Sequence, residues 1–175
     1  MSEVDEPIHV VPYDPVWQDL GRELVEQVTH VLHGLPADIA HIGSTAVPGL
    51  AAKPVIDVQV GCTASDTGRV VALLRQFGFE HFGQTGGPGR EYLRRRTGRL
   101  ANIAVVERQG PLWTDNIMFR DYLRNHPAAA ARYARVKLHA AREVGMLTAY
   151  SALKAATVAE IMREARTADP AARVG

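Results

Sequence analysis

The chain has 175 residues, of which 46% are hydrophobic and 22% are charged, and its formal net charge is +1. This length suits one domain that buries its own core, so we expect a single domain over residues 1–175 with loose tails at 1–7 and 167–175. So small a net charge provides no overall attraction to nucleic acid or to a membrane surface. No apolar run in the sequence is long enough to span a bilayer. We therefore expect neither nucleic acid nor a membrane as a partner.

The single cysteine, Cys62, excludes an internal disulfide framework and suits a reducing compartment. The first residues are acidic and polar, which is unlike a signal peptide. We therefore expect a cytoplasmic protein.

The first half of the chain predicts strands and helices in alternation. Residues 8–11 favour an edge strand, and Asp14-Pro15 favours the start of an amphipathic helix whose apolar residues recur at three- and four-residue steps. Residues 38–42 and 55–60 predict two central strands, the second rich in β-branched side chains. Residues 66–77 then predict a second helix.

The second half of the chain begins with a glycine-rich loop and becomes helical. Residues 83–89 contain four glycines and a proline, which favours a turn or a mobile loop. Residues 90–96 and 100–107 predict a hairpin, and three helices are expected over 113–125, 128–144 and 147–166. The fold class predicted is α+β: a mixed sheet with flanking helices and a C-terminal helical part.

Residues 41–60 combine polar chemistry with backbone constraint more densely than any other stretch. Gly43 and Ser44 can offer backbone N–H groups and a hydroxyl to a phosphate oxygen. Asp57 follows on the next predicted strand, where a cation that bridges phosphates would need an oxygen ligand. The alternatives are a simple turn at Gly43-Ser44-Thr45 and an aspartate that braces the loop through backbone N–H groups.

The stretch His-Ile-Gly-Ser-Thr-Ala-Val-Pro-Gly-Leu-Ala-Ala-Lys-Pro-Val-Ile-Asp-Val, residues 41–58, closely resembles the signature of the GrpB family. The motifs at 11–17 and 119–124 also match that family. Tyr-x-x-x-Lys spacings at 133–137 and 150–154 resemble its C-terminal helices. This resemblance implies a nucleotidyltransferase-like fold, and the same family also occurs fused to dephospho-CoA kinase.

The resemblance also implies a site with carboxylates, from which this chain departs. In the superfamily, an acid-apolar-acid pair on one strand face binds metal, but Asp57 is followed by Gln59, which can coordinate Mg²⁺ only weakly. Asn102 and Ala104 stand where many family members have a His-apolar-His pair. Glu91, on the preceding strand, could substitute for the missing acid. The departure leaves a one-metal site or a binding-only site open.

Basic side chains supply the remaining candidates. Strand alternation sends Arg94 and Arg96 to one face and Arg95 to the other, so one face either lines an anionic cleft or is simply solvated. Lys53 has the same two interpretations. The two lysines of the C-terminal helices, Lys137 and Lys154, either contact a substrate or pack their stems between helices.

The leading hypothesis is a nucleotidyltransferase that binds ATP or another nucleoside triphosphate with Mg²⁺ and adenylates or otherwise activates a small-molecule acceptor. One alternative is a catalytically reduced module that binds an anionic ligand, and another is phosphotransfer or lyase chemistry on a small phosphorylated substrate. The candidate residues are catalytic Asp57, Glu91 and Lys137; nucleotide-binding Gly43, Ser44, Thr45, Lys53, Arg94 and Lys154; and metal-binding Asp57 and Gln59.

Overall fold

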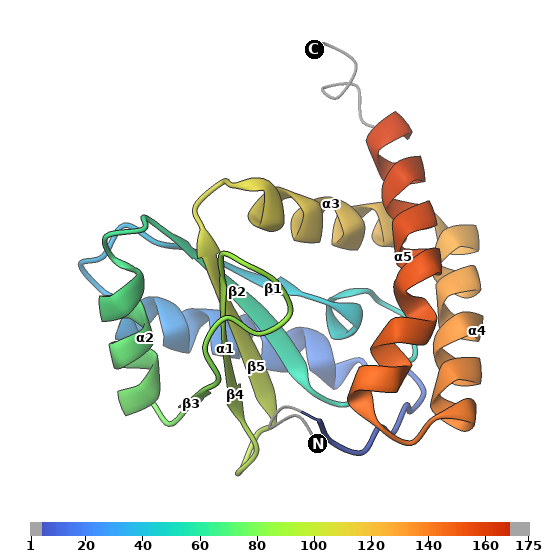
Figure 1. Ribbon diagram of the computed structural model, residues 1–175, viewed down its shortest axis with the longest axis horizontal. Helices are drawn as coiled ribbons and strands as arrows, with labels where there is room; N and C mark the ends of the chain where they lie inside the picture. Colours follow the sequence, from blue (N-terminus) through green and yellow to red (C-terminus); the bar gives the residue numbers. More distant parts are fainter. Residues whose placement is uncertain (1–4, 169–175) are drawn as a thin grey trace.

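The structure is a computed structural model that describes residues 5–168 (Figure 1). Five helices and five strands follow one another along the chain. The helices are α1 (Val16–Val31), α2 (Thr67–Gln76), α3 (Pro111–Asn125), α4 (Pro127–Glu143) and α5 (Leu147–Ala168). The strands are β1 (Asp38–Ile42), β2 (Ile56–Cys62), β3 (Glu80–His81), β4 (Arg90–Arg95) and β5 (Ala101–Glu107), with a short 3₁₀ turn, η1 (Ser44–Ala46), after β1.

The strands form one mixed sheet in the order β1-β2-β5-β4-β3. The central pair, β2 and β5, is parallel, whereas the pairs β1–β2, β4–β5 and β3–β4 are antiparallel. The register places Asp57 of β2 beside Asn102 of β5, and Asn102 beside Arg94 of β4. Three strands therefore bring polar side chains to neighbouring positions of one sheet face.

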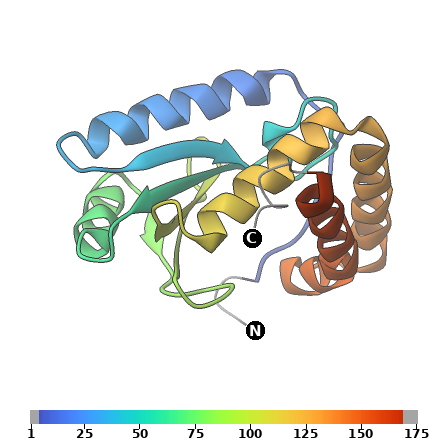
Figure 2. The same ribbon diagram turned by 90° about the horizontal axis from the view of Figure 1, so that it is seen from above.

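The opposite face of the sheet is apolar and is covered by α1 and α2. Alternate residues of β2 and β5, such as Val58, Val60 and Ile103, point into this core and are buried. Leu24 and Val28 from α1 meet them there. Figure 2 shows α1 on one side of the sheet and α3 on the other.

Helices α3, α4 and α5 lie on the polar side of the sheet and form a second apolar cluster with the loop that follows η1. Val47 and Leu50 from this loop pack with Leu123 of α3 and Ile161 of α5. The C-terminal helices are therefore anchored to the glycine-containing loop, with the start of α5 beside the end of α4 (Figure 1).

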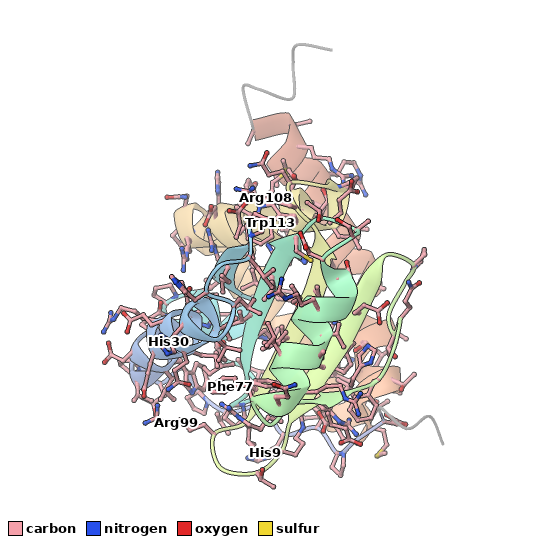
Figure 3. The ribbon with its side chains drawn as sticks, turned by 90° about the vertical axis from the view of Figure 1, so that its left-hand side faces the viewer. His9, His30, Phe77, Arg99, Arg108 and Trp113 are labelled. Atoms are coloured by element: carbon pink, nitrogen blue, oxygen red, sulfur yellow. The ribbon has the colours of Figure 1, made fainter. Side chains whose placement is uncertain are left out.

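Helix α3 begins at the end of β5, where Trp113 and Arg108 lie close together (Figure 3). A Cβ atom at Gly61 would lie 2.9 Å from the Trp113 ring, so a glycine on β2 lets the indole approach the sheet. Arg108 pairs with Asp38 of β1 at 2.8 Å. These contacts fix the end of the sheet that is remote from the β4–β5 hairpin (Figure 3).

The predicted α+β class and the order of the elements are confirmed. One prediction on the sheet was wrong: residues 38–42 do not form a central strand. Strand β1 lies at the edge of the sheet, because it pairs with β2 alone and β5 takes the other side of β2. Residues 8–11 form no strand; Val11 makes an isolated bridge with Ala52. The short strand β3 was not predicted, and its two residues give too little pattern to find.

The predicted tails are more ordered than expected. Glu6 forms an ion pair with Lys53 at 2.6 Å, and its carbonyl accepts from the backbone N–H of Leu147 at 2.9 Å. At the other end, α5 continues through Ala168. The remainder of both predicted tails, residues 1–4 and 169–175, lies outside the described residues. Within residues 5–168, no helix combines the length and apolar character needed to cross a membrane.

Candidate functional site

The turn after β1 approaches β2 so closely that only glycine fits. Gly43 has a φ of 73°, and a Cβ atom on it would lie 2.7 Å from the Oδ2 atom of Asp57. Both the left-handed backbone and the close approach exclude other side chains. Gly43 therefore brings Ser44 and Thr45 next to the carboxylate, which is the arrangement that the sequence predicted for these residues.

Side chains of α1 and α3 hold the same turn from behind. Gln18 donates to the Thr45 carbonyl at 2.9 Å, Arg120 to the His41 carbonyl at 3.0 Å, and Arg124 to the Ala46 carbonyl at 2.9 Å. The ring of His41 lies 3.0 Å from the Thr45 hydroxyl. Burial, followed by the two nearby arginines, lowers the pKa of His41 to about 4, so this histidine is neutral and acts as a structural support.

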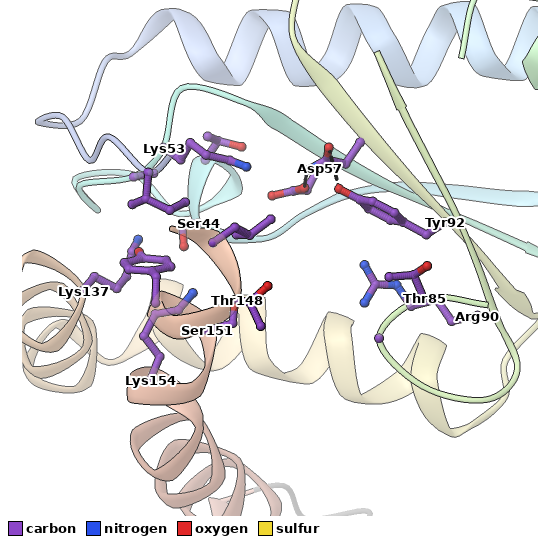
Figure 4. A pocket seen from close by; sticks show the side chains of 17 residues that line it. Ser44, Lys53, Asp57, Thr85, Arg90, Tyr92, Lys137, Thr148, Ser151 and Lys154 are labelled. Carbon is purple, nitrogen blue, oxygen red and sulfur yellow. Dashed lines mark hydrogen bonds between the residues drawn. The ribbon is translucent and has the colours of Figure 1, made fainter. Parts of the chain in front are cut away.

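A cavity of about 540 Å³ opens between the turn, the polar sheet face and the first turns of α5 (Figure 4). Its volume lies within the range of small-molecule sites. Its polar lining includes Ser44, Thr45, Lys53, Asp57, Thr85, Arg90, Tyr92, Asn102, Lys137, Thr148, Ser151 and Lys154. Six of the predicted site residues are in this set: Ser44, Thr45, Lys53, Asp57, Lys137 and Lys154.

Asp57 is held by a chain of hydrogen bonds that crosses the sheet. The Nδ2 atom of Asn102 donates to Asp57 Oδ1 at 2.7 Å. The Oδ1 atom of Asn102 accepts from the Tyr92 hydroxyl at 3.0 Å and from Arg96 at 2.9 Å. Arg96 in turn pairs with Glu6 at 2.8 Å. These hydrogen bonds fix the Oδ1 atom of Asp57 and leave its Oδ2 atom without a hydrogen bond among residues 5–168.

The two lysines of the C-terminal helices lie next to each other at one side of the cavity (Figure 4). The Lys137 side chain is 1% exposed and donates to the carbonyl of Ala51. Burial, followed by repulsion from Lys154, lowers the pKa of Lys137 to about 7. Burial also lowers the pKa of Lys154 to about 8, against the attraction of Asp57. Two amines that titrate near neutrality thus face the same space as Asp57.

Each of these lysines lies over the ring of the tyrosine one helical turn before it. Lys137 is 5.1 Å from the ring centroid of Tyr133, and Lys154 is 4.1 Å from that of Tyr150. Burial raises the pKa of Tyr133 to about 12 and raises the pKa of Tyr150 as well. The phenols therefore stay protonated, and their faces partly replace the water that the ammonium groups lose.

Three predicted site residues lie away from the cavity. Gln59 is fully buried, its amide nitrogen donating to the Trp113 carbonyl at 3.2 Å and its oxygen accepting from Asn116 at 2.9 Å. Gln59 was predicted as a metal ligand, but both ends of its amide bind groups of α3 instead. Glu91 points to the other sheet face and pairs with His81 at 2.7 Å, because it alternates with Tyr92.

The third residue that lies away from the cavity is Arg94, whereas Gly43, which is also absent from the lining, belongs to the turn at the edge of the cavity. The Arg94 guanidinium lies 4.1 Å above the Phe82 ring and 3.7 Å from the carboxylate of Glu6. The face assigned to Arg94 by strand alternation is correct, but its guanidinium meets Glu6 of the N-terminal segment and is not part of the cavity lining.

Several residues of the site were missed. Glu6 was assigned to a loose tail, although it binds Lys53 and Arg96, and these partners lower its pKa to about 2 against the opposing effect of burial. Thr148 and Ser151 carried no signal, because hydroxyls in the first turn of a helix are common. Arg90 belonged to the basic run, but nothing in the sequence separated it from its neighbours.

The donor set was tested against the Mg²⁺ that the fold family implies. Mg²⁺ prefers oxygen ligands and is commonly held by one or two carboxylates together with substrate phosphates. Asp57 Oδ2 suits an ion that arrives with phosphate oxygens. Gln59 and Asn102 supply no charge, and within residues 5–168 no group of three His, Cys, Asp or Glu side chains could enclose a metal. The residues fit one ion shared with a ligand and do not fit a two-ion site.

The protein has a nucleotidyltransferase-like fold. The structure of Cid1 in complex with its short product ApU matches it with a TM-score of 0.53 at 16% identity, over 76% of this chain and 43% of that one. The likeness shows the shared fold.

The chain belongs to the GrpB family, because the family model "GrpB protein" matches residues 7–164. The crystal structure of conserved protein GrpB from Enterococcus faecalis matches with a TM-score of 0.79 and 29% identity, over 90% of this chain and 96% of that one. A UPF0157 protein of Pseudomonas aeruginosa is 34% identical over an alignment of 173 positions, and the match covers 94% of this chain and 70% of that protein.

A dephospho-CoA kinase of Mycolicibacterium paratuberculosis is 28% identical over 178 residues. The match covers 85% of this chain but only 43% of the kinase, so more than half of the kinase has no counterpart in the match.

Proposed function

We propose that the cavity binds a nucleoside triphosphate together with one Mg²⁺ and that the protein transfers the nucleotidyl group to a small-molecule acceptor. The observation that carries the proposal is the position of Asp57: one free carboxylate oxygen beside the Gly43–Thr45 turn, in a cavity that also holds Lys137 and Lys154. An acceptor atom would attack the α-phosphorus while the bond to pyrophosphate breaks. This arrangement stands on a nucleotidyltransferase-like fold.

The site residues divide into two groups: those that would contact phosphate oxygens and one that would bind Mg²⁺. Ser44 and the adjoining backbone suit a phosphate oxygen, because a turn with glycine exposes its N–H groups. Lys137 and Lys154 suit the charge of a triphosphate and of the departing pyrophosphate. Asp57 would hold the Mg²⁺, which supplies charge neutralisation when bound.

A second candidate function is binding of an anionic ligand without turnover. Asn102 and Gln59 favour it, since neither supplies the negative charge that a second metal ion needs. In this case the lysines and Ser44 would still hold the ligand, but binding would depend little on Mg²⁺ or on Asp57.

Calorimetric titration with ATP, with and without Mg²⁺, separates these functions. Wild type, Asp57→Asn and the matched control Asp19→Asn would be compared, because Asp19 makes an exposed pair with Arg22 and neither residue lines the cavity. The proposal expects Mg²⁺-dependent binding that weakens about tenfold or more in Asp57→Asn and is unchanged in the control. Equal binding by all three proteins, indifferent to Mg²⁺, would support binding without turnover.

The transfer step has its own readout. Release of pyrophosphate during incubation with ATP and pools of small metabolites would support nucleotidyl transfer. Formation of ADP and a phosphorylated acceptor without pyrophosphate would instead indicate phosphotransfer, and release of inorganic phosphate would indicate hydrolysis.

A further inference from the structure

A second cationic position lies in the cavity, apart from the lysines. Arg90 is the first residue of β4, and its half-buried side chain lines the cavity beside Thr85. Figure 4 shows Arg90 and Thr85 on the side of the cavity away from Lys137 and Lys154, with the guanidinium pointing toward the interior.

The guanidinium of Arg90 has no anionic partner among residues 5–168, in contrast to most arginines around the site. Its Nε atom is buried and makes no hydrogen bond there. The guanidinium carbon lies 5.1 Å from the centroid of the Tyr92 ring, a contact that provides no hydrogen-bond acceptor for Nε in the plane of the guanidinium. A buried donor without a partner costs free energy, so a site of this kind is explained best by a ligand that supplies the acceptor.

The glycine-rich loop is shaped around this arginine. Gly86 has a φ of 86°, and a Cβ atom on it would lie 2.6 Å from Arg90 Nη1. The positive φ favours glycine at residue 86, and the missing side chain lets the backbone of the loop lie against the guanidinium. Thr85, the preceding residue, is held by a hydrogen bond from its hydroxyl to the Phe82 carbonyl at 2.7 Å. The loop thus fixes Arg90 toward the cavity.

We infer that Arg90, enclosed by Thr85 and Gly86, is a subsite for a carboxylate of the acceptor molecule. A guanidinium presents a planar fork that matches the two oxygens of a carboxylate, whereas an ammonium acts as a point charge. The cavity thus has lysines at one side for phosphates and a fork at another for a planar oxyanion. The acceptor class is a small carboxylic acid, and its role as acceptor rests on the proposed nucleotidyl transfer.

The test uses the resonance of the arginine itself. Side-chain ¹⁵N–¹H NMR spectra would follow the Arg90 Nε–H signal, assigned by its loss in Arg90→Lys, during titration with acetate, with glutarate and with inorganic phosphate. Arg75→Lys, an exposed arginine on α2, is the matched control. We expect saturable shifts of the Arg90 signal with both carboxylates in wild type, and about tenfold weaker glutarate binding by calorimetry in Arg90→Lys. We expect the control to match wild type.

A second arm keeps this inference separate from the proposed function. ATP binding in Arg90→Lys should stay within about twofold of wild type. An Arg90 signal that phosphate moves and carboxylates do not, or a selective loss of ATP binding in Arg90→Lys, would overturn the assignment, because Arg90 would then belong to the phosphate side. If wild type fails to bind ATP while acetate still shifts Arg90, the nucleotide proposal fails and the carboxylate subsite stands.

Discussion

The side-chain amide of Asn102 donates to Asp57 Oδ1 at 2.7 Å, across the parallel pair of central strands. The orientation of this amide is fixed, because its oxygen accepts hydrogen bonds from Tyr92 and Arg96, and a flipped amide would lose both. Asp57 therefore meets a neutral donor, and not a second acid, at the neighbouring position of β5. One oxygen of the carboxylate is committed to the sheet, and the other remains for a ligand.

Asn102→Asp should convert this pair into a site with affinity for Mg²⁺. Without metal, the introduced carboxylate repels Asp57 and loses the hydrogen bond, so we expect unfolding free energy to fall by about 1–3 kcal/mol, partly offset by Arg96. Mg²⁺ should restore the stability by binding both acids. Thermal unfolding with and without Mg²⁺ measures the effect.

Asn125→Asp is the control for that substitution, because Asn125 is exposed at the end of α3. An Asn102→Asp protein whose melting temperature responds to Mg²⁺ no more than the control would contradict the prediction. Gln59→Asp is a poorer test of the same idea. It would bury a charge and leave the Trp113 carbonyl and Asn116 without partners, so loss of folding would obscure metal binding.

Binding of ATP should take up protons near pH 8. Lys137 and Lys154 have pKa values lowered to about 7 and about 8, and a nearby polyanion would raise both, since opposite charge favours the ammonium form. ATP affinity should therefore rise as the pH falls from about 9 to about 7. Calorimetry in buffers with different ionisation enthalpies measures the uptake, and Lys154→Gln should reduce it. A proton count of zero for wild type would place the phosphates elsewhere.

The same amines predict the pH dependence of stability without ligand. Their usual pKa is 10.5, so the unfolded chain binds more protons than the folded one between about pH 7 and pH 10.5. Stability should therefore rise with pH over this window, and Lys137→Met should flatten the rise. Urea unfolding at several pH values measures this slope, and a wild-type stability that falls over the window would contradict the low pKa values.

The positions of Asp57 and of the Gly43–Thr45 turn could be predicted because both depend on local pattern: a β-branched strand, a glycine and a serine at the end of its neighbour. The faces of Arg94 and Arg95 also followed from alternation. The pairing of β2 with β5 could not be predicted, since parallel neighbours far apart in sequence leave no local signal. This pairing brings Asn102 to Asp57, and the same alternation turns Glu91 away.

Glu6 shows a second limit of prediction from sequence. Its polar surroundings are typical of a loose tail, whereas in the structure it lies between Lys53 and Arg96, 47 and 90 residues away along the chain. Long-range ion pairs of this kind depend on the complete fold. They can be recognised only after the basic residues of β4 and of the loop before β2 are placed together.

Glu6→Gln should lower stability and raise affinity for phosphates. The ion pairs lower the pKa of Glu6 from its usual 4.5 to about 2, so their contribution is complete above pH 4.5 and is lost as the pH falls toward 2. We expect a loss of about 2 kcal/mol in unfolding free energy at pH 7, measured by urea denaturation, and this loss should disappear near pH 2.

Calorimetry on the same Glu6→Gln variant should show tighter ATP binding, because Lys53 loses its competing carboxylate. Glu23→Gln, an exposed partner of Arg99, should change neither quantity appreciably.

Gly21→Ala should destabilise the turn from outside the cavity. A Cβ atom at residue 21 would lie 2.0 Å from the Nδ1 atom of His41, so α1 can reach the sheet only where it lacks a side chain. The displaced ring would lose its contact with the Thr45 hydroxyl, and we expect the unfolding free energy to fall by about 1–3 kcal/mol and ATP binding to weaken.

Gly68→Ala is the matched control on α2. No atom lies within 4 Å of a Cβ at this position, and helix propensity should raise the unfolding free energy by up to about 1 kcal/mol. Equal stability of the two variants in urea denaturation would show that His41 can move freely, and the support of the turn would then have to come from α3 alone.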